Sequence, residues 1–177
     1  YLRRAERVMA MEGQFKDLTD RKLSEQAESM RDRFRVGRED DADRLRAFAL
    51  VREAASRTIG HYAHLVQVAG ALAIDAGCIA EMATGEGKTL TATMPTTIAG
   101  WRGRGCHVLT VNDYLARRDA EWMKPLYELC GLSVGHLEQD MPPPQRRQSY
   151  LCDITYATNK EVAADFLRDR LALGRVS

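Results

Sequence analysis

One eight-residue stretch combines the residue types that bind phosphate: Met82-Ala83-Thr84-Gly85-Glu86-Gly87-Lys88-Thr89. It lies between an apolar run and an apolar helical pattern, so we expect a strand over 78–82, a tight loop, and a helix from Lys88. Gly85 and Gly87 allow the backbone to turn its N–H groups inward, and the helix dipole adds positive charge there. Lys88 supplies a mobile positive charge, and the Thr89 hydroxyl can ligate Mg²⁺.

The first position of this stretch departs from the common phosphate-loop pattern G-x-x-x-x-G-K-[ST]. Met82 stands where that pattern has glycine. A glycine-rich strand-to-helix connection without a ligand therefore remains an alternative interpretation. The form T-G-x-G-K-T is the one that helicase-like motors use, and the strand–loop–helix context favours phosphate binding.

The composition is that of an ordinary globular protein. Apolar residues make up 45% of the 177 residues, and the formal net charge of +1 gives no bulk basic excess for nucleic acid. Residues 66–82 are interrupted by polar groups and cannot supply a membrane span. The cysteines are widely spaced, without a Cys/His pair at metal-ligand spacing, so we expect no metal site: Cys78, Cys106, Cys130 and Cys152. Three of the four lie in apolar, strand-like or helical settings, which favours buried, reduced thiols in a cytosolic compartment.

After residue 77, short apolar runs alternate with amphipathic helices. We expect strands over 78–82, 106–111, 133–137 and 154–157, and helices from 88, over 114–130, near 144–150 and over 160–171. This alternation predicts an α/β fold, a parallel sheet with helices on both faces, and ligands at the carboxyl ends of its strands. Trp122 falls on the apolar stripe of its helix and is expected in the core. Asn112 and Asn159, in loops that follow two of the strands, are expected to be helix caps.

Residues 1–60 precede this alternation and are predicted to form an α-helical N-terminal segment. The first clear helix has apolar residues at helical spacing on one face: Leu23, Ala27, Met30 and Phe34. Thr19 or Asp20 can cap its start, and Gly37 can end it. The acidic run 39–43 is expected to be a solvated cap of a second helix over about 42–59.

Gln67 lies on a third helix that begins near residue 62. Its place one step from the apolar stripe favours a solvent-facing helix former. The alternative is that its amide pairs with adenine, since an amide can donate to N7 and accept from the exocyclic amine. Spacing alone favours the first interpretation.

Four runs of the sequence resemble one family. They are IAEMATGEGKTL at 79–90, TVNDYLARRDAEWM at 110–123, DITYATN at 153–159 and DFLRD at 165–169. They are similar to the first nucleotide-binding domain of the SecA family, the preprotein translocase ATPases of bacteria. The resemblance covers nearly the whole chain, and the run from Asn112 to Trp122 is specific to that family.

The resemblance implies a RecA-like P-loop domain of the superfamily-2 helicase type. Residues 1–60 would be the N-terminal helical segment, and residues 61–177 the first part of the nucleotide-binding domain, ending before its Asp-Glu motif. It implies a motor that uses ATP hydrolysis to drive preproteins through the SecYEG channel. The implied place is the cytoplasm, peripherally at the inner face of the bacterial plasma membrane. Anionic lipid and a second copy of the full-length protein are further candidate partners, and nucleic acid is not expected.

The resemblance also implies roles for individual residues toward ATP or ADP and Mg²⁺. Gln67 matches the glutamine that reads adenine, which reverses the interpretation from spacing. The phosphate loop is matched by Thr84, Gly85, Glu86, Gly87, Lys88 and Thr89. Lys88 and Thr89 are the implied catalytic residues, with the Thr89 hydroxyl on Mg²⁺. We expect the Glu86 side chain to point away from phosphate, because like charges repel.

Some positions depart from the family pattern. The aspartate usual before the glutamine is absent around Gln67, Ala83 stands where the family often has a basic residue, and Lys160 stands where it usually has asparagine. Hydrolysis needs a carboxylate pair, which the family carries after the place of Ser177, so we expect these 177 residues to bind nucleotide and hydrolyse little.

Two other functions are alternatives. One is a superfamily-2 nucleic-acid helicase domain; the run Val111-Asn112-Asp113-Tyr114 stands where a helicase of the DEAD-box type has Pro-Thr-Arg-Glu-Leu. The other is a regulatory module that binds nucleotide without turnover.

Overall fold

The structure is a computed structural model that describes residues 1–173. Its first part is helical: α1 (Leu2–Ala10), a short 3₁₀ turn (Glu12–Gln14), α2 (Asp20–Arg35), α3 (Asp41–Ile59) and α4 (Leu65–Asp75). Its second part alternates: α5 (Lys88–Trp101), β1 (Cys106–Thr110), α6 (Asp113–Leu129), β2 (Val134–His136), α7 (Pro143–Tyr150), β3 (Ile154–Thr158) and α8 (Asn159–Leu173). Most predicted elements are confirmed within two or three residues at each end.

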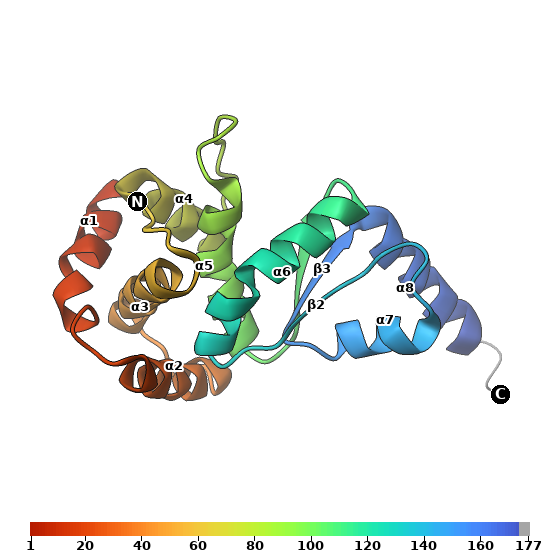
Figure 1. Cartoon of the computed structure of the whole chain (residues 1–177), viewed down its shortest axis with the longest axis horizontal. Helices are drawn as coiled ribbons and strands as arrows, with labels where there is room; N and C mark the ends of the chain where they lie inside the picture. The colour runs from red at the N-terminus through yellow and green to blue at the C-terminus, as the bar shows by residue number, and fades with distance from the viewer. Residues whose placement is uncertain (174–177) are drawn as a thin grey trace.

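The three strands form a parallel sheet in the order β1-β3-β2. Alternate residues of a strand point to opposite faces. On one face the Tyr156 hydroxyl lies 2.8 Å from that of Tyr127 on α6. On the other face the Thr155 hydroxyl donates to the Ser149 carbonyl of α7, and His107 packs edge-on against Tyr150. Helices therefore cover both faces, as Figure 1 shows, and the predicted α/β fold, RecA-like in type, is confirmed.

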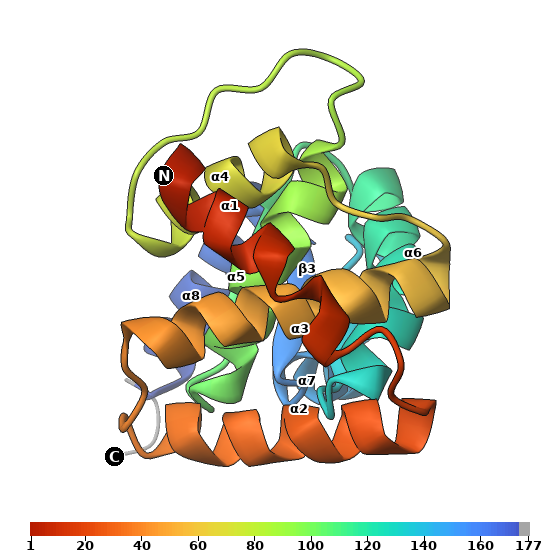
Figure 2. The ribbon, with the colours of Figure 1, turned by 90° about the vertical axis from the view of Figure 1, so that its left-hand side faces the viewer.

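The predicted strand over 78–82 is wrong. These residues form an extended loop between α4 and α5 that projects from the body of the molecule (Figures 1 and 2). The side chain of Ile79 is 99% exposed. A strand needs a neighbouring strand for its backbone groups, and no strand among residues 1–173 pairs with this segment.

Capping residues mark the starts of two N-terminal helices. The Thr19 hydroxyl caps α2 by accepting from Lys22 N at 3.3 Å, and Asp40 and Asp43 form a capping box at the start of α3. The acidic run is only partly the solvated cap that was predicted. The side chain of Glu39 is 9% exposed and lies between the guanidinium groups of Arg44 and Arg102, which link it to α3 and to the end of α5.

Most of the buried apolar side chains form one cluster that includes residues of α1–α6 and β3. At its centre Trp101 packs against Phe34 and donates from its indole nitrogen to the Cys130 carbonyl at 2.8 Å. The Cys130 thiol is buried, and burial raises its pKa to about 12. The expectation of buried thiols holds fully for Cys130 alone. Cys106 and Cys152 are partly exposed, and Cys78 is exposed because the predicted strand around it does not form.

Trp122 is not a core residue, contrary to the sequence-based expectation. Its side chain is 43% exposed. The face of α6 that packs inward carries Ala116, Ala120, Met123 and Tyr127, at the spacing of a helical stripe. Neighbours on a helix differ by about 100°, so Trp122 leaves this stripe although Met123 lies on it. No helix in residues 1–173 has the length and apolar content needed to cross a membrane.

Candidate functional site

The predicted phosphate loop ends directly at the first turn of α5. Gly85 and Gly87 have φ angles of 86° and 80°, in the left-handed region that favours glycine. Gly87 is also the N-cap of α5 and provides no side chain to cap it. A Cβ on Gly87 would lie 2.3 Å from Nε2 of Gln67, whereas one on Gly85 would meet nothing within 4 Å. Glycine is thus required at 87 by the φ angle and by the nearby Gln67 side chain, and at 85 by the φ angle alone.

The start of α5 has free hydrogen-bond donors. Within residues 1–173, the backbone N–H groups of Lys88 and Thr89 donate to no protein group. Unpaired N–H groups and the positive end of the helix dipole make such a terminus an anion site. The arrangement can bind a phosphate group.

Two charged side chains of the loop lie against its own backbone. The Lys88 ammonium donates to the Ala83 carbonyl at 2.7 Å, and a Glu86 carboxylate oxygen accepts from the Ala83 N–H at 2.8 Å. Thr84 is exposed. Both bonds lie within the loop and hold the Lys88 ammonium beside the Ala83 carbonyl. The direction of the Glu86 side chain relative to a bound phosphate stays a prediction.

The side chain of Gln67 packs against the phosphate loop and is bonded to its backbone. Its side chain is not solvent-facing, as spacing suggested, because the residue is only 9% exposed. Its Oε1 accepts from His64 N, and its Nε2 donates to the Glu86 carbonyl, each at 2.8 Å. The structure therefore brings Gln67 and the phosphate loop together, although they are about twenty residues apart in the sequence.

Asp119 is a site residue that sequence reasoning missed. Its carboxylate accepts from the Thr89 hydroxyl at 3.4 Å and from two nitrogens of Arg118. Asp119 is 7% exposed on the packed face of α6. A carboxylate on an otherwise apolar helix stripe was the available signal, since a buried charge needs partners.

The bond to Asp119 leaves Thr89 able to take a metal ion. A hydroxyl has one proton to donate and two lone pairs that accept. Thr89 uses its proton toward Asp119, so its lone pairs remain for Mg²⁺. The loop thus fits both the anion and the cation of a magnesium nucleotide.

Trp122 and His61 lie beside the residues that lead into Gln67. Their rings meet edge-on, with centroids 5.7 Å apart and an interplanar angle of 85°. This pair joins α6 to the connection between α3 and α4.

The cap prediction is confirmed for Asn112, whose Oδ1 accepts from Leu115 N at 2.8 Å. After β3 the predicted cap Asn159 is instead the first residue of α8, and Thr158 Oγ1 accepts from Glu161 N at 3.3 Å. A cavity of about 930 Å³ lies apart from the phosphate loop, between α7, α8 and the His107 face of the sheet. Among residues 1–173 no cluster of His, Cys, Asp and Glu has the geometry of a metal site.

Comparison with known proteins gives a consistent result. The family model described as the SecA DEAD-like domain matches residues 1–176. The chain is 49% identical over 168 residues to protein translocase subunit SecA 2 of Rhodopseudomonas palustris (strain BisA53), covering 94% of this chain and 20% of that protein.

Two further relatives agree. The chain is 50% identical over 169 residues to protein translocase subunit SecA of Frankia casuarinae, with 95% of this chain and 17% of that protein covered. It is 46% identical over 168 residues to protein translocase subunit SecA 1 of Corynebacterium efficiens, with 95% and 20% covered. The chain spans about a fifth of the length of these relatives. By the family match over almost its entire length, the chain belongs to the SecA DEAD-like domain family.

Proposed function

We propose that this chain is the ATP-binding part of a SecA-type motor. The observation that carries the proposal is the loop over 84–89, whose glycines, free N–H groups and Lys88 form an anion site at the start of α5. Gln67 packs against that loop and adds an amide that can recognise a base. The relatives are named translocase subunits, which supports a role in protein translocation.

The proposed ligands are ATP or ADP with Mg²⁺. The N–H groups at 88 and 89 would bind phosphate oxygens, Lys88 would exchange the Ala83 carbonyl for a phosphate, and the Thr89 hydroxyl would ligate Mg²⁺. Bound Mg²⁺ would neutralise phosphate charge and stabilise the charge that develops during phosphoryl transfer. Gln67 would give up its bond to the Glu86 carbonyl in order to hold adenine.

In the full-length protein we propose that ATP hydrolysis drives preproteins through SecYEG, at the inner face of the bacterial plasma membrane. Anionic lipid and a second copy of the protein are proposed further partners. The water-activating carboxylate pair is proposed to lie outside these 177 residues. By themselves the 177 residues are proposed to bind nucleotide and to hydrolyse it negligibly, with residues 61–177 as the first part of the nucleotide-binding domain.

The direct test is Lys88→Ala in the full-length protein, with calorimetric titration of ATP and Mg²⁺. We expect the affinity to fall about 100-fold, because a charge-assisted contact to phosphate is lost. Lys124→Ala is the control, since Lys124 is an exposed lysine of α6 whose one ion pair within residues 1–173 is with Glu128. Circular dichroism should be unchanged in both variants. Equal affinity in the Lys88→Ala variant and the parent would defeat the proposal.

A further inference from the structure

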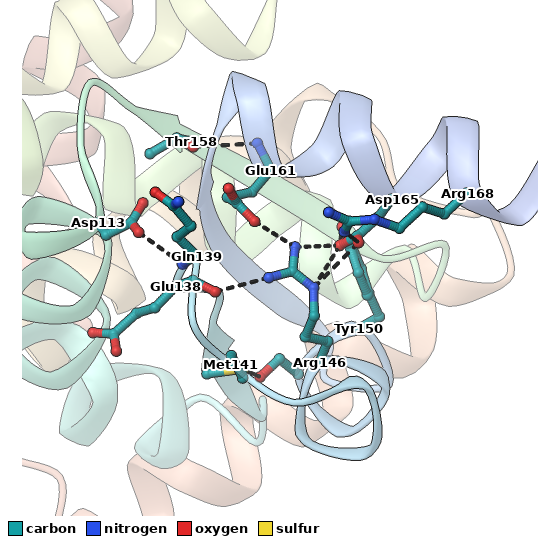
Figure 3. A network of polar contacts seen from close by, with 11 residues as sticks. Asp113, Glu138, Gln139, Met141, Arg146, Tyr150, Thr158, Glu161, Asp165 and Arg168 are labelled. Carbon is teal, nitrogen blue, oxygen red and sulfur yellow. Dashed lines mark hydrogen bonds and ion pairs between the residues drawn. The ribbon is translucent and has the colours of Figure 1, made fainter.

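Arg146 is a buried charge on the short helix α7. It is 7% exposed, and its guanidinium group contacts three other residues (Figure 3). Nη2 donates to Glu161 at 2.7 Å and to Asp165 at 2.5 Å, both on α8, and Nε donates to Asp165 at 3.0 Å. Nη1 donates to the Glu138 carbonyl at 2.7 Å. Each nitrogen of the group therefore has an acceptor.

These contacts connect the loops that follow all three strands. Glu138 belongs to the connection between β2 and α7, and the next residue, Gln139, donates from its N–H to Asp113 at the start of α6, after β1. Glu161 lies in the first turn of α8, after β3, and its own N–H is bonded to Thr158. Figure 3 shows the continuous path from Asp113 through Arg146 to Thr158.

The same path reaches the phosphate loop. Asp113 and Asp119 lie on one rigid helix, α6, and Asp119 accepts from the Thr89 hydroxyl. If Thr89 changes its hydrogen-bond partner, α6 loses its contact with the phosphate loop. The start of α6 is in turn bonded to the backbone of Gln139, and Arg146 links the neighbouring Glu138 to α8. The chain of contacts from the phosphate loop to α8 passes through this guanidinium group.

We propose that Arg146 is a positioning residue that couples nucleotide occupancy of the phosphate loop to α8. It does so by making the loops after β1, β2 and β3 move as one body. This rests on the proposed function, because occupancy of the loop is the signal. A planar group with several donors in a fixed arrangement can hold two carboxylates and a carbonyl at once, which a single ammonium cannot do in the same geometry.

The test uses the full-length protein and its Arg146→Gln variant. Arg147→Gln is the matched control, because Arg147 is exposed on the same helix and the variant removes the same charge. Hydrogen exchange is measured with and without the β,γ-imido analogue of ATP and Mg²⁺. Without nucleotide, we expect exchange over 111–115, 138–141 and 158–161 to rise together, about tenfold, in Arg146→Gln alone.

The decisive readout is the effect of nucleotide on α8. In the parent and in Arg147→Gln, the analogue should change exchange in α8; in Arg146→Gln that change should be lost while the affinity for the analogue stays within threefold. If Arg146 had a purely structural role, the Arg146→Gln variant would also show altered exchange. Its affinity for the analogue and the response of α8 would then change together. Retention of the nucleotide response in a folded Arg146→Gln variant would overturn the proposal.

A second variant keeps the test valid if Arg146→Gln does not fold. Asp113→Ala removes the acceptor of the Gln139 N–H and leaves the Arg146 contacts with α8 in place. It should likewise abolish the response of α8, and a preserved response would overturn the proposal. If the parent binds no nucleotide, the proposed function fails; the joint rise in exchange of the three loops still tests the mechanical link by itself.

Discussion

The phosphate loop and the Arg146 cluster satisfy their polar groups in opposite ways. The loop over 84–89 is exposed, two of its side chains bind backbone within five residues, and the N–H groups of Lys88 and Thr89 have no acceptor among residues 1–173. The Arg146 cluster is buried, and its guanidinium group has acceptors on the connection between β2 and α7 and on α8. The loop is built to accept an external anion, whereas the cluster is complete without one.

The largest effect is expected from Arg146→Ala. Removing one partner leaves the carboxylates of Glu161 and Asp165 without their buried cation, so the free energy of unfolding should fall by about 3 kcal/mol. Urea unfolding followed by circular dichroism measures it. Arg147→Ala should stay within about 0.5 kcal/mol of the parent. Equal losses in the two variants would show that the buried Arg146 contributes no more to the free energy of unfolding than the exposed Arg147.

The next effect separates the two glycines of the loop. Gly87→Ala forces a left-handed backbone on alanine and pushes the Gln67 amide away from Glu86, so we expect a loss of about 2 kcal/mol. Gly85→Ala meets open space and should cost about 1 kcal/mol, from the backbone alone. Thermal unfolding of both variants checks the difference. The prediction fails if Gly85→Ala is the more destabilising of the two.

Gln67→Ala tests whether the support of the loop also selects the base. The preference for ATP over GTP should fall about tenfold, because a bidentate amide-to-adenine pair discriminates by about 1–3 kcal/mol. Stability should fall by about 1 kcal/mol through the lost bond to the Glu86 carbonyl. Calorimetric titration with both nucleotides gives the ratio. Unchanged discrimination would restrict Gln67 to supporting the loop.

The smallest effect is on pH dependence. Burial raises the pKa of Asp165, but its hydrogen bonds with Arg146 and Tyr150 lower it by more, so the pKa lies below its ordinary value. The stabilisation is therefore complete above the unfolded pKa of about 3.9 and is lost as the pH falls through the folded value. Melting temperatures from pH 6 to pH 2 should fall less steeply with pH in Asp165→Asn than in the parent. Parallel curves would contradict the prediction.

The sequence predicted the elements well wherever the signal was local. Caps such as Thr19 and Asn112 and the left-handed glycines mark helix ends within a few residues, and these expectations are confirmed. Short apolar runs and helical patterns also predicted the sheet and its covering helices. The strand expected over 78–82 failed because a strand is defined by its neighbours, which composition does not reveal.

The site could be predicted only in part for the same reason. The loop over 84–89 was visible as a contiguous pattern, whereas the contact between Gln67 and Glu86 depends on how α4 packs against α5. Asp119 and Arg146 were not singled out, because nothing in their local spacing identifies partners 8 to 30 residues away. Buried charges are recognised from the tertiary structure, and only then do they explain which loops are joined.

The contrasting burial of the two tryptophans has a practical consequence. The chain contains only Trp101 and Trp122, one fully enclosed in the core and one 43% exposed on α6 beside His61. Their emission can be separated with a collisional quencher such as acrylamide, which reaches Trp122 and is excluded from Trp101. A single fluorescence experiment on these residues can thus follow unfolding of the core through one indole and the surroundings of Gln67 through the other, without an added label.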